Sequence, residues 1–288
     1  MHVGDGGPRG RTGGDLVVAG LIHPTALVDA AAELDAGVSV GPHAVIGAGV
    51  EIGADTEVGA QVQIRGRTRI GRENRIYPMA SVGFDPQDLK YEGEESWLEI
   101  GDRNQIREFT TLNRGTGFGG GVTRIGDDNL LMAYVHVGHD SQVGSRVILT
   151  NAATLAGHVE VADDATISAF SSVHQFCRVG RHAYIGGYSV ITQDALPFGR
   201  TVGQKPQCYG VNAIGLERKG FDKARIGAVE AAFRVLLRSR KNISQAIATL
   251  REEGEVTADV EHLIGFIEAS ERGVIRFQRR GSRGAAPA

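Results

Sequence analysis

The stretch LTNAATLAGHVEVADDATI, residues 149–167, carries an aliphatic residue at every sixth position, namely Leu149, Leu155, Val161 and Ile167. The same spacing holds without a miss over residues 125–191. A helix would repeat every 3.6 residues and a half-buried strand every second residue, so neither explains a strict six. A parallel β-helix does, because each six-residue segment supplies one short strand and one corner, and three segments make a coil. The sequence therefore predicts a mainly β solenoid.

The interior of this solenoid is predicted to be narrow. Glycine accounts for 41 residues, while aromatic residues make up only 6% of the chain. Because strand side chains alternate, the positions two residues before each aliphatic residue should also face inward. These positions hold small residues, which are Ala153, Val159, Ala165, Ser171, Cys177 and Ala183. Glycine often follows the aliphatic residue, as in Ile46-Gly47 and Ile52-Gly53, where it is expected to accommodate the dihedral angles of a corner.

Two stretches interrupt the repeat. The first, FDPQDLKYEGEESWLE at residues 84–99, lies between two residues of the series that are eighteen positions apart, Val82 and Ile100. It is therefore expected to take the length of one full coil. The second, NRGTGFGGGVTR at residues 113–124, shifts the phase of the series by one residue. Loops that project from a rigid scaffold commonly carry binding groups, so the first stretch is a candidate for function.

The chain is predicted to divide into four parts. Residues 1–20 are expected to form a flexible extension, and residues 21–210 the β-helix, with loops near 84–98 and 113–124. Residues 211–279 are expected to form an α-helical domain, because the aliphatic spacing becomes helical over residues 226–240, 243–254 and 260–277. Residues 280–288 are expected to form a flexible tail. A stacked solenoid needs its ends covered, which gives the helical domain a structural reason to exist.

Composition excludes several classes of protein. The formal net charge of -3 argues against a general nucleic-acid binder. Two cysteines, Cys177 and Cys208, are no disulfide framework and fit a reducing cytoplasm. The apolar run at residues 16–22 is too short for a signal sequence or a membrane span. These features favour a cytoplasmic protein without stable membrane insertion.

A polar cluster occurs in YVHVGHDS, residues 134–141, where His136, His139 and Asp140 fall within five positions. Their spacing from the inward Val137 places both imidazoles outside the prism, near a corner. Residues eighteen apart share a column, with a rise of about 4.8 Å per coil. The two columns are His139, Gly157 and Gln175, and Asp140, His158 and Phe176, with His174 beside them.

This cluster has three interpretations. His139 can act as a general base if a neighbouring carboxylate such as Asp140 fixes its tautomer, and Gly157 can present its amide to an oxyanion. The histidines can instead be part of a metal site. In the third interpretation they are solvated corner residues, with Asp140 an ordinary turn aspartate. Convergence of several histidines in stacked columns favours a functional site.

Several motifs then resemble one known family. They are QDLKY (87–91), EIGDRNQIRE (99–108), NRGT (113–116), HVGHD (136–140), TLAGH (154–158), VHQFC (173–177) and GVNAIGLERKGF (210–221). Together with the repeat they resemble the UDP-N-acetylglucosamine O-acyltransferases of lipid A biosynthesis over roughly residues 21–277. The resemblance implies a left-handed parallel β-helix with a C-terminal α-helical domain, assembled as a homotrimer with active sites between subunits. The left hand comes from the resemblance alone, because chain crossovers generally prefer the right.

The resemblance also implies an activity and a set of site residues. The family transfers an (R)-3-hydroxyacyl chain from acyl carrier protein to the 3-hydroxyl of the sugar, with no metal and no cofactor beyond the carrier's phosphopantetheine. His139 corresponds to the general base, Asp140 to its orienting carboxylate and Gly157 to the oxyanion donor. Substrate contacts correspond to Asp88, Lys90, His136, His158, His174, Gln175, Asn212 and Arg218. The residues that set acyl length correspond to Tyr184, Gly187 and Lys205.

The sequence departs from the family at two positions. Ile214 stands where a glutamate lies near the uridine ribose, and Lys219 replaces an arginine of an Arg-Arg pair. Lysine keeps the charge but loses the bidentate fork. The sugar could therefore be UDP-N-acetylglucosamine or its 3-amino analogue. A basic run around residues 218–240 is a candidate surface for docking an acidic carrier protein. Its members are Arg218, Lys219, Lys223, Arg225, Arg234, Arg238 and Arg240.

Three rival classes remain. The related N-acyltransferase of the same pathway carries a sizeable uridine-binding domain before its β-helix, whereas only about twenty residues precede the repeat here. A zinc hydratase of the carbonic anhydrase type uses the same solenoid and needs three imidazoles facing one metal. It has no use for the QDLKY loop or for the GVNAIGLERKGF segment. A purely structural β-helix would not need the histidine columns.

Overall fold

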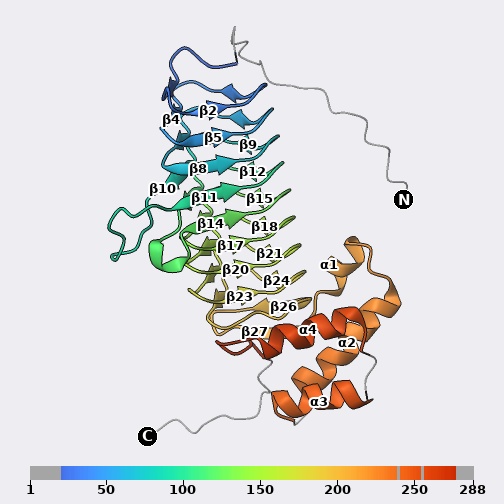
Figure 1. The fold of residues 1–288 in the computed structure, drawn as a ribbon. Helices are drawn as coiled ribbons and strands as arrows, with labels where there is room; N and C mark the ends of the chain where they lie inside the picture. The colour runs from blue at the N-terminus through green and yellow to red at the C-terminus, as the bar shows by residue number, and fades with distance from the viewer. Residues whose placement is uncertain (1–20, 239–240, 254–255, 277–288) are drawn as a thin grey trace, which may run out of the picture.

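A computed structural model describes residues 21–238, 241–253 and 256–276. The chain winds into a three-walled prism of parallel strands, followed by a group of helices (Figure 1). The predicted extension at residues 1–20 and the tail at 280–288 lie outside the described residues.

Each coil contributes one strand to each wall, so strands three apart in sequence pair with one another. The first wall contains β1 (Leu27–Val28), β4 (Val45–Ile46), β7 (Gln63–Ile64), β10 (Ser81–Phe84), β13 (Thr111–Asn113), β16 (His136–Val137), β19 (Thr154–Leu155), β22 (Ser172–Val173) and β25 (Val190–Ile191). The second wall contains β2 (Glu33–Leu34), β5 (Val50–Ile52), β8 (Arg67–Ile70), β11 (Trp97–Ile100), β14 (Val122–Ile125), β17 (Gln142–Val143), β20 (Glu160–Val161) and β23 (Arg178–Val179).

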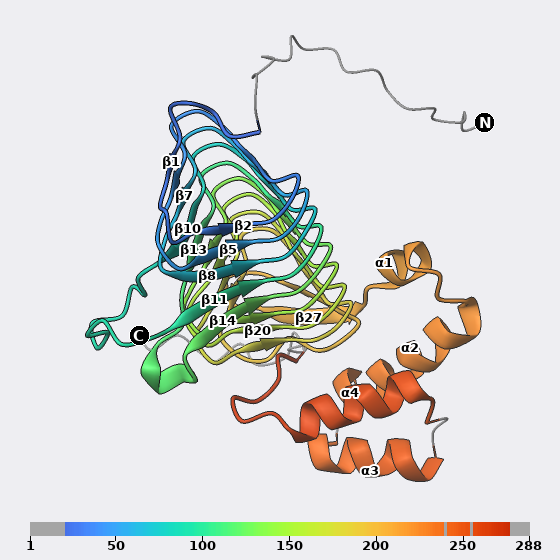
Figure 2. The same ribbon diagram turned by 45° about the horizontal axis from the view of Figure 1, so that its top comes forward.

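The third wall ends in a hairpin. It contains β3 (Ser39–Val40), β6 (Glu57–Val58), β9 (Arg75–Ile76), β12 (Gln105–Ile106), β15 (Leu130–Leu131), β18 (Ile148–Leu149), β21 (Thr166–Ile167), β24 (Tyr184–Ile185), β26 (Gly199–Val202) and β27 (Gln207–Val211). All pairs are parallel except β26 with β27, which is antiparallel. Figure 2 shows the triangular outline of the stacked coils.

The interior confirms the six-residue pattern. Leu149 pairs with Ile167, eighteen residues later, and both are fully buried. The small residues two positions earlier, such as Ala153 and Ala165, are also fully buried. Ser171 is buried as well, and its hydroxyl donates to the carbonyl of Gly186 at 2.9 Å, which satisfies the polar group. Inward-facing residues from all three walls therefore fill one continuous narrow core.

Glycines that follow the aliphatic residues were expected to accommodate the dihedral angles of a corner, and this explanation was wrong. Gly53 and Gly59 have ordinary backbone angles, but a Cβ on either would lie under 3 Å from the backbone of the next coil. The left-handed corner residues lie elsewhere and are mostly not glycine, as at Asp55 with φ of 59°. At Gly53 and Gly59, glycine is therefore needed for the close approach of coils rather than for the corner dihedrals, whereas a Cβ on Gly47 would make only an ordinary contact at 3.5 Å.

The expected length of the first interruption was also wrong. Ile70 on β8 pairs with Ile100 on β11, thirty residues later, where a regular coil would place its partner eighteen residues later. The loop between β10 and β11 therefore adds twelve residues to a coil instead of replacing one. Val82 and Ile100 lie on adjacent walls. The second interruption separates Ile100 from its partner Ile125 by twenty-five residues, an insertion of seven.

The helices pack against the end of the prism (Figure 1). They are α1 (Ala213–Arg218), α2 (Lys223–Arg238), α3 (Ile243–Glu253) and α4 (Ala258–Glu268). The third helical stretch was expected to extend to residue 277, but α4 ends at Glu268. The chain then runs back to the prism, where Val274 bridges Asp194. Within the described ranges, no helix is both long enough and apolar enough to cross a membrane.

Candidate active site

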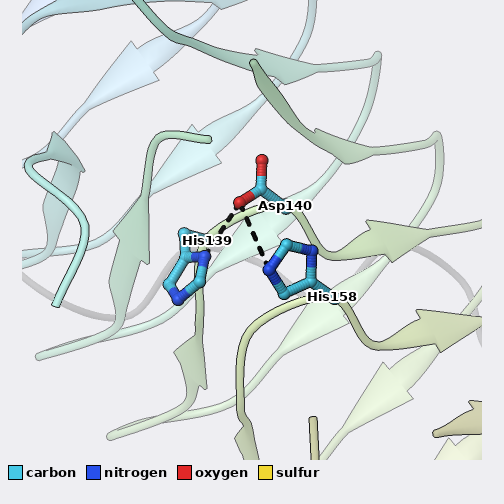
Figure 3. Close-up of side chains that lie close together, drawn as sticks. All are labelled: His139, Asp140 and His158. Atoms are coloured by element: carbon cyan, nitrogen blue, oxygen red, sulfur yellow. Dashed lines mark hydrogen bonds and ion pairs between the residues drawn. The ribbon is translucent and has the colours of Figure 1, made fainter. Parts of the chain in front are cut away.

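One corner of the prism, between the first and second walls, carries the predicted polar cluster. His139 and Asp140 follow β16, and His158 follows β19 one coil away. The Nδ1 atom of His139 lies 2.8 Å from Oδ2 of Asp140. His158 approaches the same oxygen, with its Nε2 atom at 3.8 Å (Figure 3). The two columns inferred from the sequence therefore meet at a single carboxylate.

Asp140 is the centre of this network. Its side chain is fully buried, and that of His139 is 14% exposed. Burial opposes ionisation of Asp140, but hydrogen bonds from His139 and Thr116 outweigh it and hold the pKa of the carboxyl below its usual value. The backbone N–H of Asp140 donates to Oγ1 of Thr123 at 2.8 Å. The carboxylate is thus charged, aligned and shielded from water.

The imidazoles of His158 and His136, which neighbour this pair, are partly buried. His158 stacks on Phe176, with ring centroids 4.4 Å apart, and burial lowers its pKa in spite of the nearby Asp140 carboxylate. Nδ1 of His136 lies 2.7 Å from Oγ1 of Thr111, and burial lowers the pKa of His136 too. Both histidines are therefore expected to be neutral near pH 7 and available as hydrogen-bonding groups.

Gly157 lies directly against the His139 ring. A Cβ at this position would lie 2.5 Å from Cε1 of His139, so glycine allows the imidazole to rest on the next coil. The amides on either side are used, since Ala156 donates to Val173 and His158 donates to His139. Between them, the Gly157 N–H donates to no acceptor in the part of the chain that the structure describes. An unused amide beside an imidazole can stabilise an oxyanion.

The two interrupting loops lie side by side over this corner (Figures 1 and 2). The Glu94 carboxylate accepts a hydrogen bond from the N–H of Gly117 at 3.0 Å, which joins one loop to the other. Arg114 donates to the hydroxyl of Tyr91 at 2.9 Å and also binds Asp85. The loop between β10 and β11 also carries the predicted binding residues Asp88 and Lys90, and the backbone N–H of Lys90 donates to Oδ1 of Asp88 at 3.0 Å. Asp88 is close enough to His158 to act on its charge.

His174 and Gln175 follow β22, so they lie at the same corner one coil beyond His158. Both are exposed. Nδ1 of His174 lies 3.4 Å from the guanidinium of Arg272, which arrives from the C-terminal segment. The predicted substrate contacts therefore extend along the corner for three coils.

The remaining predicted residues form a separate group on the third wall. Asn212, Arg218 and Tyr184 line a cavity of about 530 Å³ between β18, β21, β24 and α1. Ile214 lies in the same lining, which does not include His139 or Asp140. Gly187 follows β24, and Lys205 lies in the turn between β26 and β27. One chain therefore carries two groups of predicted site residues on different sides of the prism.

Two basic residues of the predicted docking surface are already engaged. Nζ of Lys219 lies 2.7 Å from Oδ1 of Asp164, and the guanidinium of Arg225 binds the buried Asp259 at 2.8 Å. The first pair joins the end of α1 to a coil, and the second joins α2 to α4. Both leave less free charge on this surface than the sequence suggested. Arg218, Lys223 and Arg234 are exposed, and Arg240 lies outside the described residues.

Among the residues that the structure describes, a metal site would have to be built from His139, Asp140 and His158, whose ligand atoms lie within 4.8 Å of one another. The Asp140 carboxylate, however, already accepts two hydrogen bonds from Thr116 and one from His139. A cation bound there would displace those donors. This donor set fits an acid–base pair better than a metal centre.

Sequence reasoning missed the role of Thr116. It lies in the NRGT motif, yet no function was assigned to it. The available signals were its place in the NRGT motif and inside an interruption of the repeat. Neither signal shows which side chain the loop contacts.

A parallel β-helix of hexapeptide repeats, with an imidazole–carboxylate pair beside an unused amide, defines the class of hexapeptide-repeat acyltransferases. Comparison with known proteins supports a narrower assignment. The sequence model described as UDP-N-acetylglucosamine O-acyltransferase, domain 2, matches residues 194–275. The chain is 53% identical over 255 residues to the acyl-(acyl-carrier-protein)–UDP-N-acetylglucosamine O-acyltransferase of Alkalilimnicola ehrlichii, covering 88% of this chain and 99% of that protein.

Other relatives agree. The enzyme of the same name from Janthinobacterium is 50% identical over 260 residues, covering 89% of this chain and 99% of the relative. The solved UDP-N-acetylglucosamine O-acyltransferase of Moraxella catarrhalis superposes with a TM-score of 0.86 at 40% identity, covering 89% of this chain and all of that one. The chain therefore belongs to the acyl-(acyl-carrier-protein)–UDP-N-acetylglucosamine O-acyltransferase family, and its coils form a left-handed β-helix.

Proposed function

We propose that the protein transfers an (R)-3-hydroxyacyl chain from acyl carrier protein to the 3-hydroxyl of UDP-N-acetylglucosamine, the first step of lipid A biosynthesis. Family membership supports the reaction. The single observation that carries the mechanism is the buried hydrogen bond between His139 and Asp140, next to the free amide of Gly157.

The mechanism follows from that geometry. A sugar hydroxyl is a weak nucleophile at neutral pH and needs a base within reach. Since Nδ1 of His139 donates to Asp140, the Nε2 atom is the one that accepts the hydroxyl proton. The sugar oxygen attacks the thioester carbonyl, and the oxyanion is stabilised by the Gly157 N–H.

Collapse of this intermediate breaks the carbon–sulfur bond and releases the carrier's phosphopantetheine thiolate. The imidazolium of His139 then returns its proton to that thiolate, which closes the proton cycle. Asp140 remains ionised and stabilises the imidazolium while it exists. No acyl-enzyme is needed, and Cys177 is fully buried in the core, where it cannot reach a thioester.

We assign the sugar nucleotide and the acyl chain to the other site residues. Asp88, Lys90, His136, His158, His174 and Gln175 bind the sugar nucleotide or the acyl donor near the catalytic corner, and Asn212 and Arg218 bind the nucleotide. Tyr184, Gly187 and Lys205 set acyl length. Because the two groups lie on different sides of one chain, the complete site requires residues from two copies. A homotrimer with sites between subunits meets this requirement.

The partner and compartment follow from the same assignment. The exposed Arg218, Lys223 and Arg234 provide a basic surface for acidic acyl carrier protein. The reaction needs no cofactor apart from the carrier's own phosphopantetheine. Cys177 and Cys208 are unpaired and buried, as suits a reducing cytoplasm.

A second acceptor, the 3-amino analogue of the sugar nucleotide, is a specific alternative because Ile214 removes a carboxylate that the family places near the ribose. The two are separated by incubating the protein with each sugar nucleotide and a series of hydroxyacyl carrier proteins. We expect faster acylation of UDP-N-acetylglucosamine, with an oxygen-linked product by mass spectrometry. Preferential acylation of the amino analogue would reassign the acceptor, and acylation of neither would overturn the proposal.

A further inference from the structure

Thr116 makes two hydrogen bonds to the carboxylate of Asp140. Its backbone N–H donates to Oδ1 at 2.9 Å, and its hydroxyl donates to Oδ2 at 2.7 Å. Both residues are buried, at 1% and 4% exposure. Oδ2 is also the oxygen that lies 2.8 Å from Nδ1 of His139. One threonine therefore binds both oxygens of the carboxylate that orients His139.

Thr116 reaches Asp140 only because of the second insertion. The threonine caps a short 3-10 turn, Gly117–Gly119, and its Oγ1 accepts the N–H of Gly119 at 3.1 Å. A Cβ on Gly119 would overlap with the Asp140 carboxylate, so the turn lies flush against it. The seven added residues thus form a loop that covers Asp140. The side of this loop that faces Asp140 carries the two donors of Thr116.

The cover is held by the first insertion. Oε1 of Glu94 accepts from the N–H of Gly117, and this hydrogen bond holds the pKa of Glu94 below its usual value. Tyr91 and Asp85, from the same loop, bind Arg114 two residues before Thr116. The loop that carries Asp88 and Lys90 is therefore physically joined to the residue that aligns Asp140.

We propose that Thr116 is a positioning residue for the acyl transfer: it holds the Asp140 carboxylate in place, so that His139 presents Nε2 to the acceptor hydroxyl. The inference rests on the proposed role of His139 as general base. Thr116 is buried and acts through Asp140.

The test compares Thr116→Val and Thr116→Ser with the wild type. Valine has the same shape but no hydroxyl, whereas serine keeps the donor. The valine variant loses one hydrogen bond to a charged group, so the partial loss of alignment should lower its kcat about tenfold, equivalent to about 1.4 kcal/mol. KM for the sugar nucleotide should change less than about twofold, and serine should restore kcat to within about threefold. Thr56→Val is the matched control, since Thr56 is a buried threonine that donates to Gly71 far from the site.

A double-mutant comparison distinguishes a positioning role of Thr116, which depends on Asp140, from a general structural role. In an Asp140→Asn background the carboxylate is gone, so Thr116→Val should lower kcat by less than about twofold further. Thr116→Ala, which adds no bulk under the turn, serves the same comparison if the valine variant does not fold.

The outcomes are distinct. A Thr116→Val enzyme with wild-type kcat, or a full tenfold loss that persists in the Asp140→Asn background, overturns the positioning role. Either result leaves the proposed function intact if His139→Ala is inactive. A His139→Ala enzyme with wild-type activity would overturn the assignment of His139 as the general base, and this inference with it. A wild-type protein that acylates neither sugar nucleotide would instead overturn the proposed function itself.

Discussion

Two corners of the prism have the same backbone and different chemistry. Between the third and first walls, Tyr134 has φ of 64° and is 60% exposed, and its ring stacks on Phe109 with centroids 4.9 Å apart. Between the first and second walls, Asp140 has φ of 60° and is buried. The two corners differ because the loop inserted before β14 covers Asp140, and its Thr116 hydroxyl donates to the carboxylate. A regular repeat thus supplies the geometry, and an interruption makes one corner a candidate site.

The largest effect is expected from the histidine at the covered corner. His139→Ala should lower turnover about 10²-fold or more, because a positioned general base contributes about 10²–10⁴-fold. His43→Ala is the matched control, since His43 is an exposed left-handed residue at the open corner and should leave turnover unchanged. Steady-state acyl transfer with folding checked by circular dichroism decides this. Equal losses in the two variants would remove the distinction between the corners.

A smaller effect is expected from the glycine beneath the imidazole. Gly157→Ala should lower turnover by up to about 10²-fold, because the new Cβ pushes the His139 ring away from its place and a shift near 1 Å can cost that much. Gly47→Ala is the matched control, because a Cβ there meets its nearest neighbour at an ordinary 3.5 Å. Loss of activity in both variants to the same extent would indicate damage to the coils rather than to the base.

Much of the difference between the two corners could be predicted from the sequence. The inward series and the stacking of His158 above Asp140 follow from a fixed number of residues per coil, so periodicity predicted them. The size of the first insertion did not follow, because Val82 and Ile100 keep the six-residue phase whether the loop replaces a coil or enlarges one. The contact of Thr116 with Asp140 joins residues twenty-four positions apart through an irregular loop, which no repeat determines.

The third prediction concerns acyl length. A Cβ on Gly187 meets only the carbonyl of Ala169 at 3.3 Å, so a larger side chain can point away from the coils. If Gly187 sets the end of the acyl groove, Gly187→Met should exclude about two methylenes, a loss of about 1.6 kcal/mol or roughly 15-fold in preference against the longer donor. Relative kcat/KM over a donor series tests this. A uniform decrease at all lengths would show damage to the assembly instead.

The smallest effect is expected in the pH dependence of stability. Burial holds the pKa of His182 and His262 below 6.5, at the junction where Arg181 and Arg225 bind Asp259. The unfolded chain therefore takes up protons at higher pH than the folded one. Unfolding free energy should be constant above about pH 6.5 and decrease as the pH falls below it, by at most about 1.4 kcal/mol per pH unit per histidine.

Urea unfolding of the wild type and of His262→Gln between pH 7.5 and 5.5 checks this prediction. The variant should lose less stability on acidification, because glutamine does not titrate. An unchanged slope would mean that His262 does not contribute to the acid sensitivity of the junction.

Chemical rescue of His139→Ala tests the central claim most directly, since the cavity left by alanine can admit a free imidazole. The account predicts slow acyl transfer to UDP-N-acetylglucosamine by the folded variant. Added imidazole should accelerate that transfer, increasingly so for more basic derivatives, while the wild type should not respond. Acyl transfer by His139→Ala at the wild-type rate without any added base would contradict the assignment of His139 as the general base.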